Sequence, residues 1–280
     1  MPVAKREDIE CHDGATENDP RVYVINGQNY RSVTSVLRYD AEGSYYLEEW
    51  FKKNGLDSDR QRDESGLVGS VFHKAAEDMV TGGRVVNDSL IYDLKLGLSD
   101  LAVKYDARTL SHSTTLFKRV QRCLQGLTNF WLEYKPDTIA AERVVYADKI
   151  GRQETRVSGS LDLECVIDGV PTVIDFKTSK SIHQSYLVQS SVYSYMLWGE
   201  DQHGEYQGDD WYKGRQVGVL HLGNSTKQLY SWKVVPDKHR NRKDVPGFLN
   251  RFGMLSDLHA LDFPKVKPKE ETLYPTEWSL

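Results

Sequence analysis

Hydrophobic residues follow helical spacing through the first half of the chain and alternate at strand spacing in much of the second half. Apolar positions three and four residues apart predict helices over 32–37, 45–53, 66–80, 88–106 and 113–134, after a small hairpin over 21–30. From residue 139, β-branched residues predict strands in AAERVVYA, TRVSGSLDLECVI, PTVIDFKTS, RQVGVLHLG and KQLYSWKVV, with helices over 184–198 and 245–260.

This order of elements predicts an α/β (α+β) fold, in which flanking helices cover a mixed β-sheet. We expect a flexible tail over 1–20 and an N-terminal helical region over 21–135. A core of sheet and helices over 136–262 follows, and the Pro-rich and Lys-rich residues 263–280 predict an irregular tail.

Composition and charge exclude several classes of protein. Of the 280 residues 28% are charged, the mean hydropathy is -0.57, and no apolar run approaches the roughly 18 residues that a membrane span needs. The net charge of -5 argues against a protein that coats nucleic acid through bulk positive charge. Three distant cysteines offer no disulfide framework, and the first residues show no targeting signal. We therefore expect a cytoplasmic protein without a membrane partner.

The segment GSLDLECVIDGVPTVIDFKTS carries the most specific chemical signal. Asp168-Gly169 is a strong hairpin signal, because a two-residue type I′ turn needs positive φ at both central positions. If the residues that flank this turn pair with each other, Asp162 lies directly opposite Asp175, and Lys177 shares their face. The opposite face is then apolar and packs on the core through Leu161, Leu163, Ile174 and Phe176.

Two opposed carboxylates need a compensating charge. Opposed residues have Cβ atoms roughly 4.5–5.5 Å apart, and two anions about 5 Å apart repel by about 3 kcal/mol at an effective dielectric constant near 20. Mg²⁺ or Mn²⁺ would remove this repulsion, and the carbonyl of Phe176 would add an oxygen ligand. Lys177 would then orient a water molecule or stabilise charge on a phosphate. An exposed strand face with a Lys–Asp pair is the alternative, and a slip in register would separate the acids.

These motifs resemble a known family. Three motifs resemble the PD-(D/E)XK nuclease superfamily in its RecB-like branch. They are GSLD, then IDFKTS with thirteen residues from Asp162 to Asp175, and then a Q-x-x-x-Y pattern at Gln189 and Tyr193. Upstream, GSVFHKAAE is similar to the G-x-x-x-H-x-x-x-E helix of that branch. YRSVTSVL and the YLEEW helix further resemble the mitochondrial genome maintenance exonucleases and their phage and bacterial relatives. The resemblance covers about residues 30–235 and implies a restriction-endonuclease-like core.

The resemblance implies a metal site. Asp162 and Asp175 would bind catalytic Mg²⁺ or Mn²⁺, His73 would be a further ligand, and Lys177 would act on the water or the phosphate. Glu142 matches an acidic position on the first strand of the family, with an ordinary exposed strand glutamate as the open alternative. The four cysteines that hold an iron–sulfur cluster in some RecB-like nucleases are missing, so no cluster is expected.

Further residues are expected to support the site or to contact DNA. Glu77, one helical turn after His73, would orient that histidine. Gln189 and Tyr193 would support the site or contact DNA, with ordinary helix–sheet packing as the alternative. Aromatic residues would supply stacking surfaces for bases, with a helix–helix core as the alternative. Basic residues would contact phosphates, with a solvated helix start as the alternative. These candidates are Tyr45, Trp50, Lys238, Arg240 and Arg242.

The implied function is a Mg²⁺-dependent or Mn²⁺-dependent DNA exonuclease. It would act on single-stranded or frayed ends in replication, recombination, repair or phage genome processing, in a bacterial or phage-infected cell, with the N-terminal helices as an arch over the groove. Two alternatives stay open. One is an endonuclease or double-strand exonuclease of the same superfamily, and the other is a non-catalytic nucleic-acid-binding protein that retains the fold.

Overall fold

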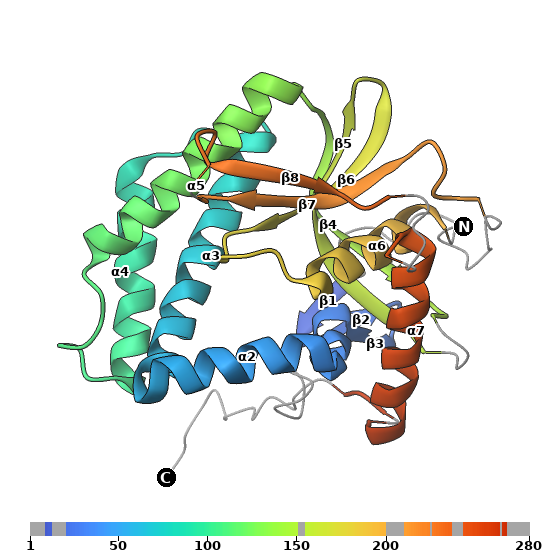
Figure 1. The fold of residues 1–280 in the computed structure, drawn as a ribbon, viewed down its shortest axis with the longest axis horizontal. Coiled ribbons are helices and arrows are strands. Elements are labelled where there is room, and N and C mark those ends of the chain that lie inside the picture. Colours follow the sequence, from blue (N-terminus) through green and yellow to red (C-terminus); the bar gives the residue numbers. More distant parts are fainter. Residues whose placement is uncertain are drawn as a thin grey trace, which may run out of the picture.

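An eight-stranded mixed β-sheet runs through the described part of the chain, and helices cover its two faces (Figure 1). The computed structural model describes residues 9–12, 21–150, 155–199, 210–224, 226–236, 243–263 and 265–267, with only the backbone for 41–47. Neighbouring strands follow the order β1-β2-β3-β5-β6-β7-β8, and β4 pairs with β5. The strands are β1 (Ile9–His12), β2 (Val22–Ile25), β3 (Gln28–Ser32), β4 (Asp137–Ala147), β5 (Val157–Ile167), β6 (Val170–Lys177), β7 (Gln216–Leu222) and β8 (Tyr230–Val234).

Two hydrophobic clusters fill the space between the sheet and the helices. One cluster joins α3, α4 and α5 to the sheet, and the other joins α1, α6 and α7 to it. Successive buried residues of β7 enter different clusters, Val219 with α6 and α7 and Leu220 with α3 and α5, as expected of a strand buried on both faces. The helices are α1 (Val33–Val36), α2 (Ala41–Asn54), α3 (Ser58–Val80), α4 (Asn87–Lys104), α5 (Ser113–Tyr134), α6 (Gln184–Trp198) and α7 (Val245–Asp262).

The predicted α/β (α+β) fold class is confirmed. The predicted helices over 88–106, 113–134, 184–198 and 245–260 match α4 to α7 closely. The helices α2 and α3 begin earlier than their apolar periodicity indicates. The first turns of α3 are polar and are stabilised by pairs such as Arg60–Glu64, whose charged atoms lie 2.8 Å apart at i,i+4 spacing. Within the described residues, no helix combines the length and the apolar character that a bilayer crossing requires.

The N-terminal residues contribute strands to the central sheet. The predicted hairpin turned at Asn26-Gly27 is confirmed as β2 and β3, and β3 pairs in parallel with β5. The predicted flexible tail over 1–20 needs correction, because β1 pairs antiparallel with β2. The sequence did not predict β1, because so short a polar segment forms a strand only by pairing with β2. The rest of the predicted tail, residues 1–8 and 13–20, lies outside the described residues.

The hairpin that joins β5 and β6 has the predicted register. Asp168 and Gly169 have φ values of 50° and 78°, as a type I′ turn requires, and Leu163 pairs with Ile174. The predicted apolar face is only partly correct: Leu163 and Ile174 pack against α3 and α5, but Leu161 packs in the cluster of α6 and α7. The β5–β6 ladder ends at the pair Leu163 and Ile174, so the register that predicted a common face does not extend to Leu161.

Candidate metal centre

Three carboxylates come from the neighbouring strands β4, β5 and β6. Residues on either side of Glu142 pair with residues on either side of Asp162, so these two acids lie opposite each other. The β5–β6 ladder ends at the pair Leu163 and Ile174, one residue short of Asp162 and Asp175. The three acids therefore gather from positions that are distant in the chain, at the point where this ladder ends.

His73 reaches these carboxylates from α3. Phe72, its neighbour in the chain, is fully buried, and His73 lies at the edge of the buried stripe with its side chain 30% exposed. The imidazole ring packs against Phe72 and Phe176, with centroid distances of 5.6 and 6.3 Å. Its Nδ1 lies 3.2 Å from Oδ1 of Asp162 and 3.7 Å from Oε1 of Glu142.

His73, Glu142 and Asp162 together form a group that could hold a metal ion. One ligand atom from each residue lies within 4.8 Å of the other two. Carboxylate oxygens suit Mg²⁺ and Mn²⁺, and the imidazole favours the transition metal of the two. The donor set of this group therefore fits the ion that the sequence predicts, with Glu142 in place of Asp175 as the second close carboxylate.

Glu142 adopts an unusual backbone conformation. Its φ is 46°, in the left-handed region, although it lies in the middle of β4 and has a Cβ atom. Its Oε2 accepts a hydrogen bond from the Ser160 hydroxyl at 3.0 Å. Such a conformation costs about 1–2 kcal/mol and is typical of positions where surrounding structure holds a functional side chain.

Asp162 and Asp175 are both buried but have different partners. Oδ2 of Asp162 accepts a hydrogen bond from the backbone N–H of Phe176 at 2.5 Å, where the ladder between the strands has ended. Asp175 is 1% exposed, and Lys177 Nζ donates to its Oδ1 at 2.8 Å. Its Oδ2 lies 2.6 Å from the same ammonium but makes no hydrogen bond of acceptable geometry within the described residues. Both oxygens of Asp175 therefore lie within ion-pair distance of the Lys177 ammonium.

Two side-chain cations balance the three acids. Burial disfavours the charged imidazole, but the charge of Asp162 and the hydrogen bonds to Asp162 and Glu142 raise the pKa of His73 to about 10. Burial and the charge of Asp162 raise the pKa of Asp175 to about 6, against the opposite effect of Lys177. The positive charges of Lys177 and His73 therefore offset part of the repulsion between the carboxylates, which the sequence analysis assigned to a divalent cation.

The pair Gln189 and Tyr193 lies on α6, and the two residues bond each other. Both side chains are buried, and Gln189 Nε2 donates to the Tyr193 hydroxyl at 2.9 Å. Burial, with the charges of Asp175 and Asp162, holds the pKa of Tyr193 well above its usual value, so the phenol is neutral. Glu77 makes no side-chain hydrogen bond or ion pair to any described residue, and the predicted contact with His73 is not among the observed ones.

Two neighbours of Lys177 were not predicted from the sequence. The ammonium of Lys177 lies 5.1 Å from the centroid of the Tyr186 ring, which α6 supplies. His221 pairs with Lys177 across β6 and β7, and its Nε2 bonds the carbonyl of Ser179. His221 thus anchors the loop that follows β6. No spacing pattern in the sequence indicates either residue, because both contacts depend on how the elements pack.

The predicted DNA-contact residues are mostly outside the described part of the chain. Trp50 on α2 is half-buried and packs edge-to-face on Phe51 at 5.5 Å. The side chain of Tyr45 and all of Lys238, Arg240 and Arg242 lie outside the described residues. The sequence matches no protein-family model and no curated protein.

Proposed function

We propose that this protein is a Mg²⁺-dependent or Mn²⁺-dependent deoxyribonuclease of the PD-(D/E)XK type, RecB-like branch, that hydrolyses DNA phosphodiester bonds from strand ends. The observation that carries the proposal is the group of His73, Glu142 and Asp162 next to the Asp175–Lys177 pair. A lone D-x-K pattern is common on exposed strands. Two buried aspartates and a half-buried glutamate, with a histidine and a lysine beside them, are suited to phosphate chemistry.

The residues of the chain divide the work of this reaction. A divalent cation, when bound by His73, Glu142 and Asp162, supplies Lewis-acid polarisation of a phosphate oxygen and lowers the pKa of a water molecule. Lys177 positions the attacking water and stabilises the negative charge that develops on the phosphate. Asp175 and the Tyr186 ring hold the lysine ammonium in place, so that little side-chain entropy is lost when substrate binds.

The preference for strand ends rests on the helices around the site. In Figure 1, α2 runs from the region of β2 and β3 to the foot of α3. Its aromatic and basic residues, Trp50 and Lys53 among them, suit contacts with a single strand. The proposed place of action is the cytoplasm of a bacterial or phage-infected cell, and the proposed partner is single-stranded or frayed DNA.

The test uses three labelled substrates: linear single-stranded DNA, linear duplex DNA and closed circular single-stranded DNA. With Mn²⁺ or Mg²⁺ the wild-type protein should shorten the linear single strands, and EDTA should abolish the reaction. Asp162→Asn should lose this activity, whereas Asp100→Asn, the same change at an exposed position of α4, should keep it.

Each contrary outcome has a defined meaning. Cleavage of the circles would show an endonuclease. DNA binding without hydrolysis under either metal would favour a non-catalytic binding protein. Full activity of a correctly folded Asp162→Asn variant, checked by circular dichroism, would overturn the assignment of the site.

A further inference from the structure

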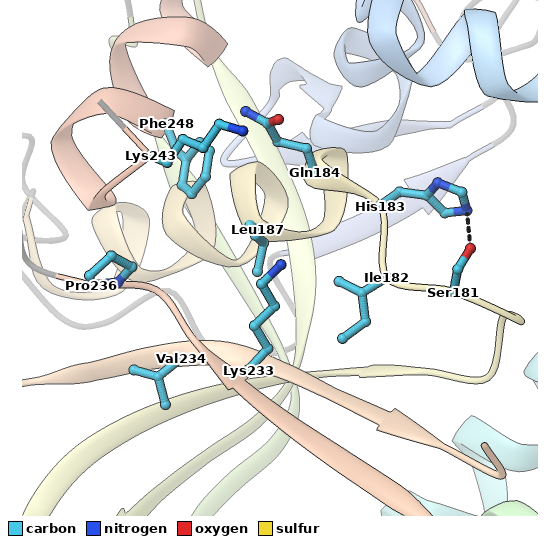
Figure 2. Close-up of a pocket in the computed structure, with 10 residues that line it drawn as sticks. All are labelled: Ser181, Ile182, His183, Gln184, Leu187, Lys233, Val234, Pro236, Lys243 and Phe248. Atoms are coloured by element: carbon cyan, nitrogen blue, oxygen red, sulfur yellow. Dashed lines mark hydrogen bonds between the residues drawn. The ribbon is translucent and has the colours of Figure 1, made fainter. Parts of the chain in front are cut away.

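A pocket of about 590 Å³ lies between α6, α7 and β8, beside the loop that leads away from Lys177 (Figure 2). Apolar side chains form much of its wall, including Leu187 of α6 and Phe248 of α7. The polar residues that line it are Ser181, His183, Gln184, Lys233 and Lys243. A volume of this size is typical of small-molecule sites.

The charge of the pocket is positive. Lys233 projects from β8 toward Leu187, and Lys243 lies just before α7 (Figure 2). Neither lysine makes an ion pair with a described residue, and none of the described residues that line the pocket is acidic. Lys243 also belongs to the basic run 238–243 in the sequence, of which it alone is described. Apolar walls with two ammonium groups, neither in an ion pair with the described part of the chain, suit a ligand with a planar ring and a phosphate.

The sheet places this pocket close to the candidate metal centre. Asp175 pairs with Val219 of β7, and Val219 pairs with Lys233 of β8, so the three residues lie in one row and share a face. Neighbouring strands are about 4.8 Å apart, which puts the Cα atom of Lys233 about 10 Å from that of Asp175. Val219 packs in the same hydrophobic cluster as Leu187 and Phe248, two residues that line the pocket.

A second connection runs through Tyr186. Its ring lies 5.1 Å from the ammonium of Lys177 and 5.3 Å from the ring of His183, which lines the pocket. One side chain therefore separates the lysine of the candidate metal centre from the pocket wall.

We propose that this pocket binds a phosphorylated nucleotide, with the phosphate at Lys233 and Lys243 and the base against the wall that includes Phe248. The inference rests on the proposed function in one respect: in an exonuclease this nucleotide is the phosphorylated end of the DNA strand. A free mononucleotide, the product of the reaction, has the same chemistry. Competition by a mononucleotide distinguishes the free nucleotide from the strand end.

The experiment measures binding by fluorescence anisotropy with the full chain in EDTA, so that no hydrolysis occurs. The probes are short single-stranded oligonucleotides with a 5′-phosphate, a 3′-phosphate or neither, and the competitors are a deoxynucleoside monophosphate and inorganic phosphate. A phosphate at one of the two ends should tighten binding by about tenfold or more. Lys233→Ala and Lys243→Ala should each remove most of this gain. Competition by the mononucleotide would identify a free nucleotide as a ligand, and its absence would restrict the site to strand ends.

Lys227→Ala is the matched control, because it removes an exposed lysine from the same β7–β8 hairpin but outside the pocket. An equal loss of affinity in Lys227→Ala would mean unspecific electrostatic attraction and would overturn the proposal. So would wild-type affinity in folded Lys233→Ala and Lys243→Ala proteins. Phosphate-dependent binding without any nuclease activity would support the nucleotide pocket and reject the proposed function. Nuclease activity without phosphate-dependent binding would support the proposed function and reject the nucleotide pocket.

Discussion

Glu142 allows a direct measurement of backbone strain at the candidate metal centre. Its φ of 46° costs a residue with a Cβ atom about 1–2 kcal/mol, a cost that glycine does not incur. Glycine in a strand otherwise destabilises by about 0.5–1 kcal/mol relative to alanine. We therefore expect Glu142→Gly to be more stable than Glu142→Ala by about 0.5–1 kcal/mol. Both variants lose the same carboxylate, so the loss of its contacts with His73 and Ser160 cancels in the comparison.

The assay is urea denaturation of the two variants and of a control pair at the next residue. Arg143 has no positive φ, so Arg143→Ala should be the more stable of its pair by about 0.5–1 kcal/mol. The difference between the two pairs then equals the left-handed penalty, about 1–2 kcal/mol, because the entropic cost of glycine is common to both. If alanine is favoured equally at both positions, Glu142 is not held in a strained conformation and this reasoning fails.

Three other predictions concern packing, pH and the lysine. Gly159→Ala should lower stability by about 1–3 kcal/mol, because its Cβ atom would lie 2.7 Å from the Tyr193 ring. Gly66→Ala, whose Cβ atom would meet nothing within 4 Å, should raise stability by about 0.5–1 kcal/mol. Thermal melts of the two variants and the wild type measure both changes. Burial lowers the pKa of His259 from 6.5 to about 4, so the unfolded chain binds a proton in this window that the folded chain does not. Stability should therefore fall by about 2 kcal/mol as the pH drops from 6.5 to 4, and denaturation of His259→Phe over the same range should lack this component. Lys177→Met should reduce DNA hydrolysis by about 10²–10³-fold while calorimetry still detects Mn²⁺ binding, and loss of the metal as well would assign the lysine a structural role.

The fold class and the β5–β6 hairpin were predictable because their signals are local. Alternation and helical periodicity depend on residues a few positions apart, and Asp168-Gly169 specifies its turn through the backbone preferences of two residues. Once the turn is known, the strand period of two gives the register as far as the pair Leu163 and Ile174, next to Asp162 and Asp175. The polar first turns of α3 and the strand β1 lack such a local signal, and they were missed.

The composition of the candidate site was less predictable than its location. The sequence emphasised Asp175 as a metal ligand, but the closest group contains Glu142 with His73 and Asp162, and Asp175 holds Lys177. A single glutamate in a strand has no motif that distinguishes a ligand from a solvated residue. Its left-handed backbone depends on the register of β4 against β5, which lies beyond any local window.

The amino-acid sequence by itself determined the order of helices and strands, the tight turn and the register beside it, because each depends on short-range geometry. The family resemblance named His73 and Glu142 as candidates, but only the tertiary structure decided that both lie close to Asp162 and that Tyr186 lies between Lys177 and the basic pocket. These contacts join residues from different elements. Their distances are set by how helices pack on the sheet, and the hydrophobic effect that drives this packing is non-directional.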